Sequence, residues 1–411
     1  MVRRTKQTTT AIAALALVFG VGRAAQAQDV RVQVNDVQVV VPVEVLRQVQ
    51  RIVETTVAPQ VRVEIGHVVR EVIAEVSSIG REVGREISRE VEREFGRESW
   101  QQRGADRNEG RNQDREFPVE QIDKQTTKIA LGANGSLELK NISGDIIVTG
   151  GNGREVTMDI TRRSRGRTDA DAKLGLEQVK VEVDHRGDRA NVETRYPEQQ
   201  GRQRLPYSVS VAYVISAPAG TRMNITNISG DVTVKGMTGD LSLDVVSGDI
   251  QIINSTRVMN VKSISGDTLL ADVQNDAVLT VGSVSGDLTL QRVKVRRLAV
   301  NVISGDVVAT DVTADGVELR SMSGSVEYSG PLTRSGRYDL QAHSGDVRLV
   351  ITGNVGFDLR AETFSGRIQS DAGIDLKNST NTRRSLRGTV GDGSAVVVAT
   401  TFSGNVIVSR R

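Results

Sequence analysis

The phrase NISGDVTVKG, residues 227–236, nearly repeats the phrase NISGDIIVTG, residues 141–150. Its serine returns at regular intervals along the rest of the chain, and a glycine follows that serine every time. From Ser229 onward the steps between these serines are 18, 18, 20, 19, 19, 21, 21 and 38 residues. The serines are Ser143, Ser229, Ser247, Ser265, Ser285, Ser304, Ser323, Ser344, Ser365 and Ser403. A fixed period along a sequence predicts a repeat architecture, in which one small structural unit recurs.

Each repeat carries the pattern of two short β-strands. Apolar residues stand six and four positions before every serine, as Leu241 and Leu243 do before Ser247. Alternation with a period of two places one face of a strand in a core. After the corner a second strand begins, as in Ile250-Gln251-Ile252, and only Thr268 departs from an apolar residue at its first position.

The fold class that follows is mainly β, a parallel β-solenoid. One unit cannot bury both of its sides, whereas stacked units superpose their apolar positions in register. We expect about ten coils of roughly 19 residues between Ser229 and the C-terminus, coiled as a right-handed β-helix because parallel crossovers are right-handed. The last step of 38 residues is twice 19, which predicts one degenerate coil between Ser365 and Ser403. With strands roughly 4.8 Å apart, ten coils form a rod on the order of 45 Å long.

The recurring glycine predicts a recurring tight corner. Such a corner often needs φ > 0, which glycine adopts without steric cost. Ser and Asp side chains beside the glycine can hydrogen-bond the freed backbone groups of the turn. We therefore expect ten structural turn residues: Gly144, Gly230, Gly248, Gly266, Gly286, Gly305, Gly324, Gly345, Gly366 and Gly404.

Residues 1–27 are typical of a secretory signal peptide. A basic start precedes a short apolar core and the small-x-small sequence Ala25-Gln26-Ala27, so we expect export and cleavage before Gln28. The apolar run is about half of the roughly 20 residues that a membrane-spanning helix needs, and no later segment is apolar enough to span. Localisation in the periplasm, on the cell surface or outside the cell is therefore expected.

Charge and cysteine usage narrow the function classes. Without the four basic residues of the signal peptide, 49 of the 53 basic residues remain against 51 acidic residues, a net charge of −2. The excess of basic residues in the full chain comes from the signal peptide, so it gives no indication of a nucleic-acid partner. The chain has no cysteine, which excludes disulfides, thiol catalysis and cysteine-bound metals.

Residues 28–98 are expected to hold a strand, residues 30–41, followed by a charged amphipathic helix. Ile79, Val83, Ile87, Val91 and Phe95 stand four residues apart between balanced Arg and Glu residues. This narrow apolar stripe indicates self-association through residues 79–95 or docking on a partner; a solvated arm and a membrane-contacting helix are the alternatives. Residues 99–117 are polar and predict a flexible linker.

Residues 118–220 form a β-rich block that leads into the solenoid, residues 221–411. The expected strands of the block are residues 129–131, 155–160, 179–183, 190–194 and 208–215. A short helix is expected up to Gln178, capped by Thr168. The basic tract of Arg162, Arg163, Arg165 and Arg167 is interpreted as a solvated loop, since aromatic platforms for single-stranded nucleic acid are sparse.

Several phrases together resemble one known family. They are LELKNISGDIIVTG, VAYVISAPAG, TRMNITNISGDVTVKG and the closing VVVATTFSGNVIVSRR. The chain from about residue 119 to residue 411 resembles a bacterial family of exported β-strand-repeat proteins, a domain of unknown function often labelled "putative adhesin". The resemblance implies a β-solenoid in the cell envelope, and some relatives are thought to act in envelope-stress responses. The family has no established catalytic residues, so the resemblance implies none here.

The aspartate that follows most corner glycines is the candidate metal ligand. Stacked carboxylates could bind Ca²⁺, which takes 6–8 oxygen ligands. The alternative is that each aspartate caps its own turn. Replacement by Ser325, Arg367 and Asn405 in later repeats, without loss of the corner, favours capping. The ladder comprises Asp231, Asp249, Asp267, Asp287 and Asp306, with Asp145 and Asp346 at its ends.

No other chemistry is indicated. His343 stands at an apolar, coil-stacked position and is expected to pack near Phe364 rather than to act in catalysis. No zinc-binding spacing is present, and no cofactor is expected.

Two function classes remain. The first is a non-catalytic envelope protein, an adhesin-like solenoid that binds, or serves as a scaffold for, another surface protein or glycan. The second is a polysaccharide-active lyase or hydrolase on the same scaffold. A catalytic groove should interrupt the ladder with aromatic or acidic insertions. The main irregularity, residues 371–393, is instead basic and without aromatics, which favours the first class.

Overall fold

The computed structural model of the chain describes residues 30–34, 37–41, 117–197, 205–370 and 377–411. The expected signal peptide, charged helix and linker lie outside these residues. No helix in the described ranges is long and apolar enough to cross a membrane.

The chain divides into two compact units, Met1–Ser77 and Ser78–Arg411. In the first unit, β1 (Val30–Val34) pairs antiparallel with β2 (Val37–Val41). The segment that the sequence predicted as one strand therefore holds two.

The second unit is built on two long sheets. In spatial order, the first sheet contains β26 (Lys377–Asn381), β27 (Ser385–Val390), β24 (Phe357–Ser365), β28 (Ala395–Ser403), β22 (Arg337–Ser344), β20 (Gly316–Ser323), β18 (Lys294–Ser304), β16 (Gln274–Ser285), β14 (Val258–Ser265), β12 (Leu241–Ser247), β10 (Arg222–Ser229), β4 (Ser136–Ser143), β8 (Arg189–Arg195) and β7 (Lys180–Arg186). The second sheet contains β25 (Ile368–Ser370), β29 (Val406–Arg410), β23 (Val347–Thr352), β21 (Val326–Pro331), β19 (Val307–Thr310), β17 (Leu288–Gln291), β15 (Thr268–Ala271), β13 (Ile250–Ile253), β11 (Val232–Lys235), β5 (Ile146–Gly151), β9 (Tyr207–Pro218), β6 (Val156–Gly166) and β3 (Val119–Ile129).

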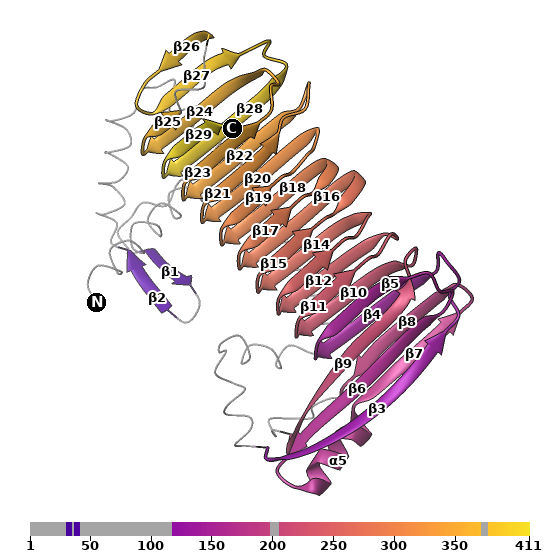
Figure 1. Cartoon of the computed structure of the whole chain (residues 1–411). Coiled ribbons are helices and arrows are strands. Elements are labelled where there is room, and N and C mark those ends of the chain that lie inside the picture. The colour runs from indigo at the N-terminus through magenta and orange to yellow at the C-terminus, as the bar shows by residue number, and fades with distance from the viewer. Residues whose placement is uncertain (1–29, 35–36, 42–116, 198–204, 371–376) are drawn as a thin grey trace. The chain divides into compact units, whose positions relative to one another are not determined.

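Each coil runs along one strand of the first sheet, turns at the Ser-Gly corner and continues along one strand of the second sheet. Successive coils stack in parallel, as the ladder of arrows in Figure 1 shows. The predicted mainly β composition and the parallel stacking of a solenoid are confirmed.

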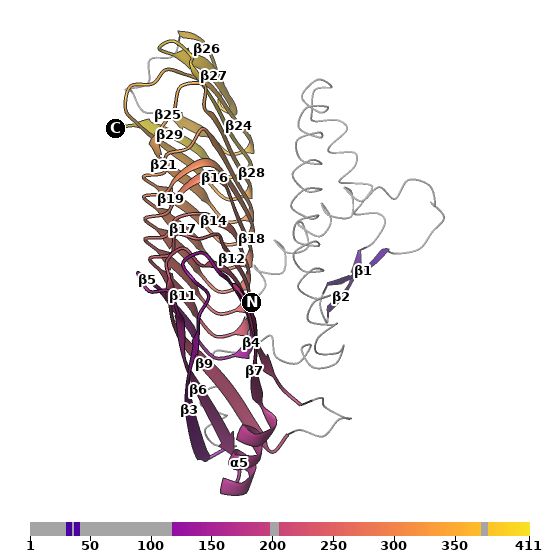
Figure 2. The same ribbon diagram turned by 90° about the vertical axis from the view of Figure 1, so that its right-hand side faces the viewer.

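The core lies between the two sheets, which form two layers in Figure 2. Leu243 of β12 lies beside Ile225 of β10 and Val261 of β14, so the apolar columns superpose as the repeat predicted. All three side chains are 0% exposed. Each fully buried aliphatic side chain contributes about 1.5–3 kcal/mol. Columns of Val, Ile and Leu therefore supply the main stabilisation of a chain without disulfides.

One predicted core position is displaced. Met259 was expected to point inward, but Val258 is buried and Met259 only half-buried. The cause is a register shift between β12 and β14, at which Leu241 pairs with Val258.

The order of the coils departs from the order of the sequence at the C-terminal end. β28 and β29, the last strands of the chain, lie between β22 and β24 in one sheet and between β23 and β25 in the other. Ser403 therefore pairs with both Ser344 and Ser365.

The expectation of a degenerate coil between Ser365 and Ser403 is wrong. β27 instead pairs antiparallel with β24, and β26 pairs antiparallel with β27. These two strands cover the outer edge of β24, which would otherwise present unpaired backbone groups. The 38-residue step holds this edge cover instead of a coil.

At the other end of the unit the strands become antiparallel. β9 pairs parallel with β5 but antiparallel with β6, and β3 pairs antiparallel with β6. Four of the five strands expected in this block overlap β6, β7, β8 and β9 over most of their length. The strand expected at residues 129–131 is instead the end of β3, which stops at Ile129.

The helix α5 (Asp169–Gln178) confirms the predicted cap. The hydroxyl of Thr168 accepts a hydrogen bond from the backbone N–H of Asp171, and the Asp171 carboxylate accepts one from the backbone N–H of Thr168. This reciprocal pair satisfies two donors that a helix start leaves free.

The basic tract predicted as a loop is a strand. Its first three arginines lie within β6, and Arg167 follows that strand. Arg162 forms an ion pair with Asp123, and Arg165 forms one with Glu120 at 3.0 Å. Acidic residues on β3 face these arginines across the antiparallel pair, which the spacing of the tract alone does not reveal.

Candidate functional site

The stacked corners are the first feature that the recurring phrase builds. Nine of the ten corner glycines have φ between 122° and 158°, and Gly366 in the last coil is the exception. A Cβ atom added to Gly266, whose φ is 122°, would lie 2.2 Å from the carbonyl oxygen of Gly248 in the neighbouring coil. Glycine is therefore required for two reasons, a left-handed φ and the close approach of the next corner.

Hydrogen bonds tie each corner to its neighbours. The N–H of Gly266 donates to the carbonyl oxygen of Ser285 in the following coil, at 3.1 Å. The N–H of Asp267 donates in the other direction, to Oδ1 of Asp249 at 2.9 Å. Oδ1 of Asp267 in turn accepts from the N–H of Asp287 at 3.0 Å. Each aspartate thus caps the corner of the following coil, so the expectation that it caps its own turn is wrong in this detail.

A column of small polar side chains lies inside the corner, two residues before the serine. Asn227 Nδ2 donates to the carbonyl oxygen of Gly230 at 2.8 Å, and Thr401 Oγ1 donates to that of Gly345 at 2.8 Å. These bonds satisfy corner carbonyls that face the core, where an unpaired polar group is costly. Sequence reasoning missed this column because Val245, Val302 and Ala342 interrupt it.

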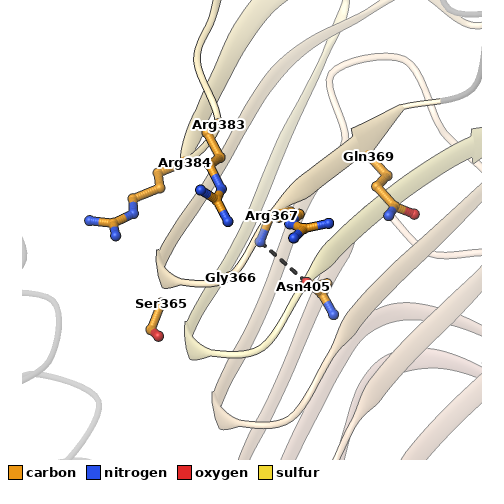
Figure 3. A pocket seen from close by; sticks show the side chains of 7 residues that line it. All are labelled: Ser365, Gly366, Arg367, Gln369, Arg383, Arg384 and Asn405. Carbon is orange, nitrogen blue, oxygen red and sulfur yellow. Dashed lines mark hydrogen bonds between the residues drawn. The ribbon is translucent and has the colours of Figure 1, made fainter.

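The last corner of the stack opens on a hollow of about 540 Å³ (Figure 3). Arg367 takes the place that aspartate holds in the inner coils, and its backbone N–H donates to Oδ1 of Asn405 at 3.2 Å. The lining residues are Ser365, Gly366, Arg367, Gln369, Arg383, Arg384 and Asn405.

Two arginines reach the hollow from the segment before β27. The carbonyl oxygen of Arg383 accepts from the N–H of Ile368 at 3.3 Å, and that of Arg384 accepts from the N–H of Thr363 at 2.9 Å. The segment is thus fixed to the last coil through its backbone. Figure 3 shows the Arg383 side chain lying between those of Arg367 and Arg384.

The arginines that line the hollow differ from the other arginines at this end of the solenoid in their charged neighbours. Arg360 and Arg387 both bind Glu362, at 3.1 and 2.7 Å. Burial raises the pKa of Glu362, but the hydrogen bonds from Arg387 and Arg360 outweigh it and hold that pKa below the usual value. The guanidinium groups of Arg367, Arg383 and Arg384 have no ion-pair partner among the described residues.

The repeat and its corner also match a known family. Residues 238–409 match the family model described as Toastrack DUF4097. This part of the chain is similar to the Toastrack family. The resemblance seen in the sequence is thereby confirmed for residues 238–409, and the model does not extend over residues 119–237. No curated protein matches the chain.

Several solved structures show some likeness to the chain. A putative adhesin from Bacteroides fragilis is 12% identical, covers 72% of this chain and 99% of its own, and has a TM-score of 0.34. A putative cell adhesion protein from Clostridium sporogenes is 9% identical, covers 71% and 100%, and has a TM-score of 0.19. A putative lipid binding protein from Parabacteroides distasonis is 12% identical, covers 70% and 97%, and has a TM-score of 0.40. Values this low carry no argument about what this chain binds.

Along the solenoid, the aspartate ladder presents exposed carboxylates that each accept a hydrogen bond from a backbone N–H of the next coil. Among the described residues, no group of three His, Cys, Asp or Glu side chains is placed to hold a metal ion. What the geometry shows of these carboxylates is their hydrogen bonds to the backbone of the neighbouring coils.

His343 lies in a stack of three aromatic rings on the solenoid. Its ring stacks on Phe402 at 5.0 Å between centroids, and Phe402 stacks on Phe364 at 4.7 Å. Phe402 separates His343 from Phe364 because the C-terminal coil lies between their coils. Burial lowers the pKa of His343 below its ordinary value, as expected for an imidazole packed among apolar rings.

Proposed function

We propose that this chain is an exported, non-catalytic protein of the cell envelope, an adhesin-like solenoid that serves as a binding or scaffold surface. The observation that carries the proposal is the hollow at the last corner, which is lined by three arginines and by residues with neutral donors. Arginine stays protonated over the physiological pH range, so this arrangement suits holding a partner rather than moving protons.

The regular ladder of corner aspartates also supports a non-catalytic role. The side chains that could supply acid–base chemistry along the corners, the aspartates, each hold a backbone N–H of the neighbouring coil. The partner in this proposal is another envelope or surface component, a protein or a glycan. The location proposed is the periplasm, the cell surface or the medium, and the signal-peptide pattern of residues 1–27 supports it.

The alternative, a polysaccharide-active enzyme, needs two carboxyl groups flanking a sugar-binding groove. The residues that line the hollow are Arg, Gln, Asn, Ser and Gly, so none of them supplies a carboxylate. The geometry of this hollow therefore favours the binding role.

Fractionation and an activity assay test the proposal together. We expect the native protein in the envelope or the medium, with an N-terminus at or near Gln28. Incubated with purified envelope polysaccharide, it should release no new reducing ends and no unsaturated products, while binding to washed envelope remains measurable. Cytoplasmic protein that retains Met1, or release of sugar fragments that a heat-treated sample does not show, would overturn the proposal.

Pairing through residues 79–95 is part of the same proposal, as a means of holding the solenoid away from its anchor surface. Light scattering should give the mature chain a mass larger than that of a monomer. A chain starting at Phe117 should have the mass of a monomer. Monomers in both samples at tens of micromolar would rule out self-pairing.

A further inference from the structure

The stack of corners leaves a donor without an acceptor at its end. In the inner coils the corner glycine N–H donates outward to the serine carbonyl of the next coil, as Gly345 does to Ser403 at 3.0 Å and Gly404 does to Ser365 at 3.3 Å. No coil follows the last corner, and the N–H of Gly366 has no acceptor among the described residues. Gly366 lines the hollow, so a backbone N–H without an acceptor in the described part of the chain borders this space.

The last corner approaches its preceding corner as closely as the inner corners do, although Gly366 lacks the positive φ of the other corner glycines. A Cβ atom added to Gly366 would lie 1.8 Å from the carbonyl oxygen of Gly404, the same close approach to the preceding corner that the inner glycines make. The corner is thus stacked in the ordinary way on its inner side and open on its outer side. An oxygen atom placed where the next serine carbonyl would stand completes the pattern of hydrogen bonds.

The charge around this N–H indicates what kind of oxygen fits. Arg367, Arg383 and Arg384 line the hollow, and no carboxylate belongs to its lining. Three like charges in one hollow repel one another, and an anion relieves that repulsion. Guanidinium groups bind phosphate and carboxylate oxygens through parallel N–H bonds. A phosphate monoester carries nearly two charges at pH 7 and three acceptor oxygens, so it balances three arginines better than a single carboxylate does.

We propose that the hollow binds a phosphate group, with one oxygen accepting from the Gly366 N–H and the others held by Arg367, Arg383 and Arg384. Ser365 and Gln369 also line the hollow, and their side chains carry neutral donors. The hollow is open, so the phosphate can be free or carried at the end of a larger molecule. This inference rests on the proposed binding function and names the chemistry of its ligand.

The inference is tested by measuring anion binding to the purified exported chain. The buffer contains no phosphate and 150 mM salt, which screens weak surface attraction. Inorganic phosphate is titrated by calorimetry, with acetate as the comparison anion. We expect phosphate to bind and acetate to bind at least about tenfold more weakly. The double variant Arg367→Gln/Arg383→Gln should weaken phosphate binding about tenfold or more.

The control removes the same charge elsewhere. Arg222 and Arg296 are exposed and lie on β10 and β18, several coils from the hollow. Arg222→Gln/Arg296→Gln should leave the phosphate affinity unchanged. An equal loss in both double variants would overturn the inference, since it would mean attraction by net charge alone. Absence of phosphate binding by the unaltered chain would also overturn it.

Two further probes distinguish the sources of the phosphate. Vesicles of phosphatidylcholine with phosphatidic acid present the group on a membrane, and glucose 6-phosphate presents it in solution. A lipid headgroup is supported if the chain cosediments with the vesicles and the variant Arg367→Gln/Arg383→Gln does not. Glucose 6-phosphate, at the same phosphate concentration, should then fail to displace the chain from the vesicles. Competition by glucose 6-phosphate at equal phosphate supports a soluble ester. If the chain binds washed envelope but none of these phosphate probes, this inference fails while the proposed binding function stands.

Discussion

Gly266→Ala is expected to destabilise the solenoid by about 3 kcal/mol or more, well above the ~1 kcal/mol that is typical of single substitutions. The φ of Gly266 is 122°, and an added Cβ would meet the Gly248 carbonyl oxygen at 2.2 Å. Backbone atoms of a stacked coil cannot move away without breaking the register of the neighbouring coils. The free energy of unfolding, from denaturant titration followed by circular dichroism, measures the effect.

Two other glycines separate the causes. Gly187 has φ 62° with nothing within 4 Å of an added Cβ, so Gly187→Ala isolates the backbone strain, about 1 kcal/mol. Gly282 has neither a positive φ nor a near neighbour, so Gly282→Ala should change stability by less than about 0.5 kcal/mol. Equal effects at all three positions would contradict the stacked-corner explanation.

Asp267→Asn serves as the companion of Gly266→Ala at the same corner. An amide oxygen can still accept the N–H of Asp287, so the loss should be small, below about 1 kcal/mol. Added Ca²⁺ should leave the melting temperature of both chains unchanged. A rise of many degrees with Ca²⁺ that Asp267→Asn abolishes would instead identify the ladder as a cation site.

Removing the C-terminal coil is expected to have an even larger effect. A chain ending at Ser394 lacks β28 and β29, which lie inside the stack rather than at its end. Val397, Val406 and Val408 are 0% exposed, and their burial alone contributes on the order of 5–9 kcal/mol. β24 also loses its parallel partner, so we expect cooperative loss of the last coils, seen as rapid proteolysis C-terminal to β22.

A pair of point variants tests the same idea in a full-length chain. Val397 is buried and its neighbour Val396 is 44% exposed on the opposite face of the strand. Val397→Asp should destabilise by at least about 3 kcal/mol, because it buries an unpaired charge, whereas Val396→Asp should be nearly neutral. If β28 lay at the end of the stack and could fray alone, both variants would leave the folding of the other coils unchanged.

Repetition made the main features of the fold predictable. Every coil repeats the alternation that Leu241 and Leu243 show, so one pattern predicted the strands, the core and the parallel stacking at once. The corner followed from glycine chemistry, because few residues other than glycine fit a left-handed turn under a neighbouring backbone.

Features without a constant residue type were not predictable. The corner after the second strand also has positive φ, but Asn254, Asp272, Arg292 and Asp311 occupy it in successive coils. The order of the last coils depends on pairing between β28 and β22, and the phrases around Ser365 and Ser403 fit either order equally well. The hollow could not be located from spacing, since Arg383 reaches Arg367 only through the backbone bonds of the segment before β27.

Cross-linking of the serine column tests the central claim of this account most directly, because the hollow exists only if the coil of Ser365 ends the stack. The chain has no cysteine, so pairs can be introduced without interference. Neighbouring corners are roughly 4.8 Å apart, within the 4.4–6.8 Å between Cα atoms that a disulfide spans, whereas corners two coils apart lie roughly 10 Å from each other. The account predicts that Ser344→Cys/Ser403→Cys forms an intramolecular disulfide under mild oxidation, detected by peptide mass spectrometry, and that Ser344→Cys/Ser365→Cys does not. A disulfide in the second pair and none in the first would contradict the inserted coil and, with it, the open corner at Gly366.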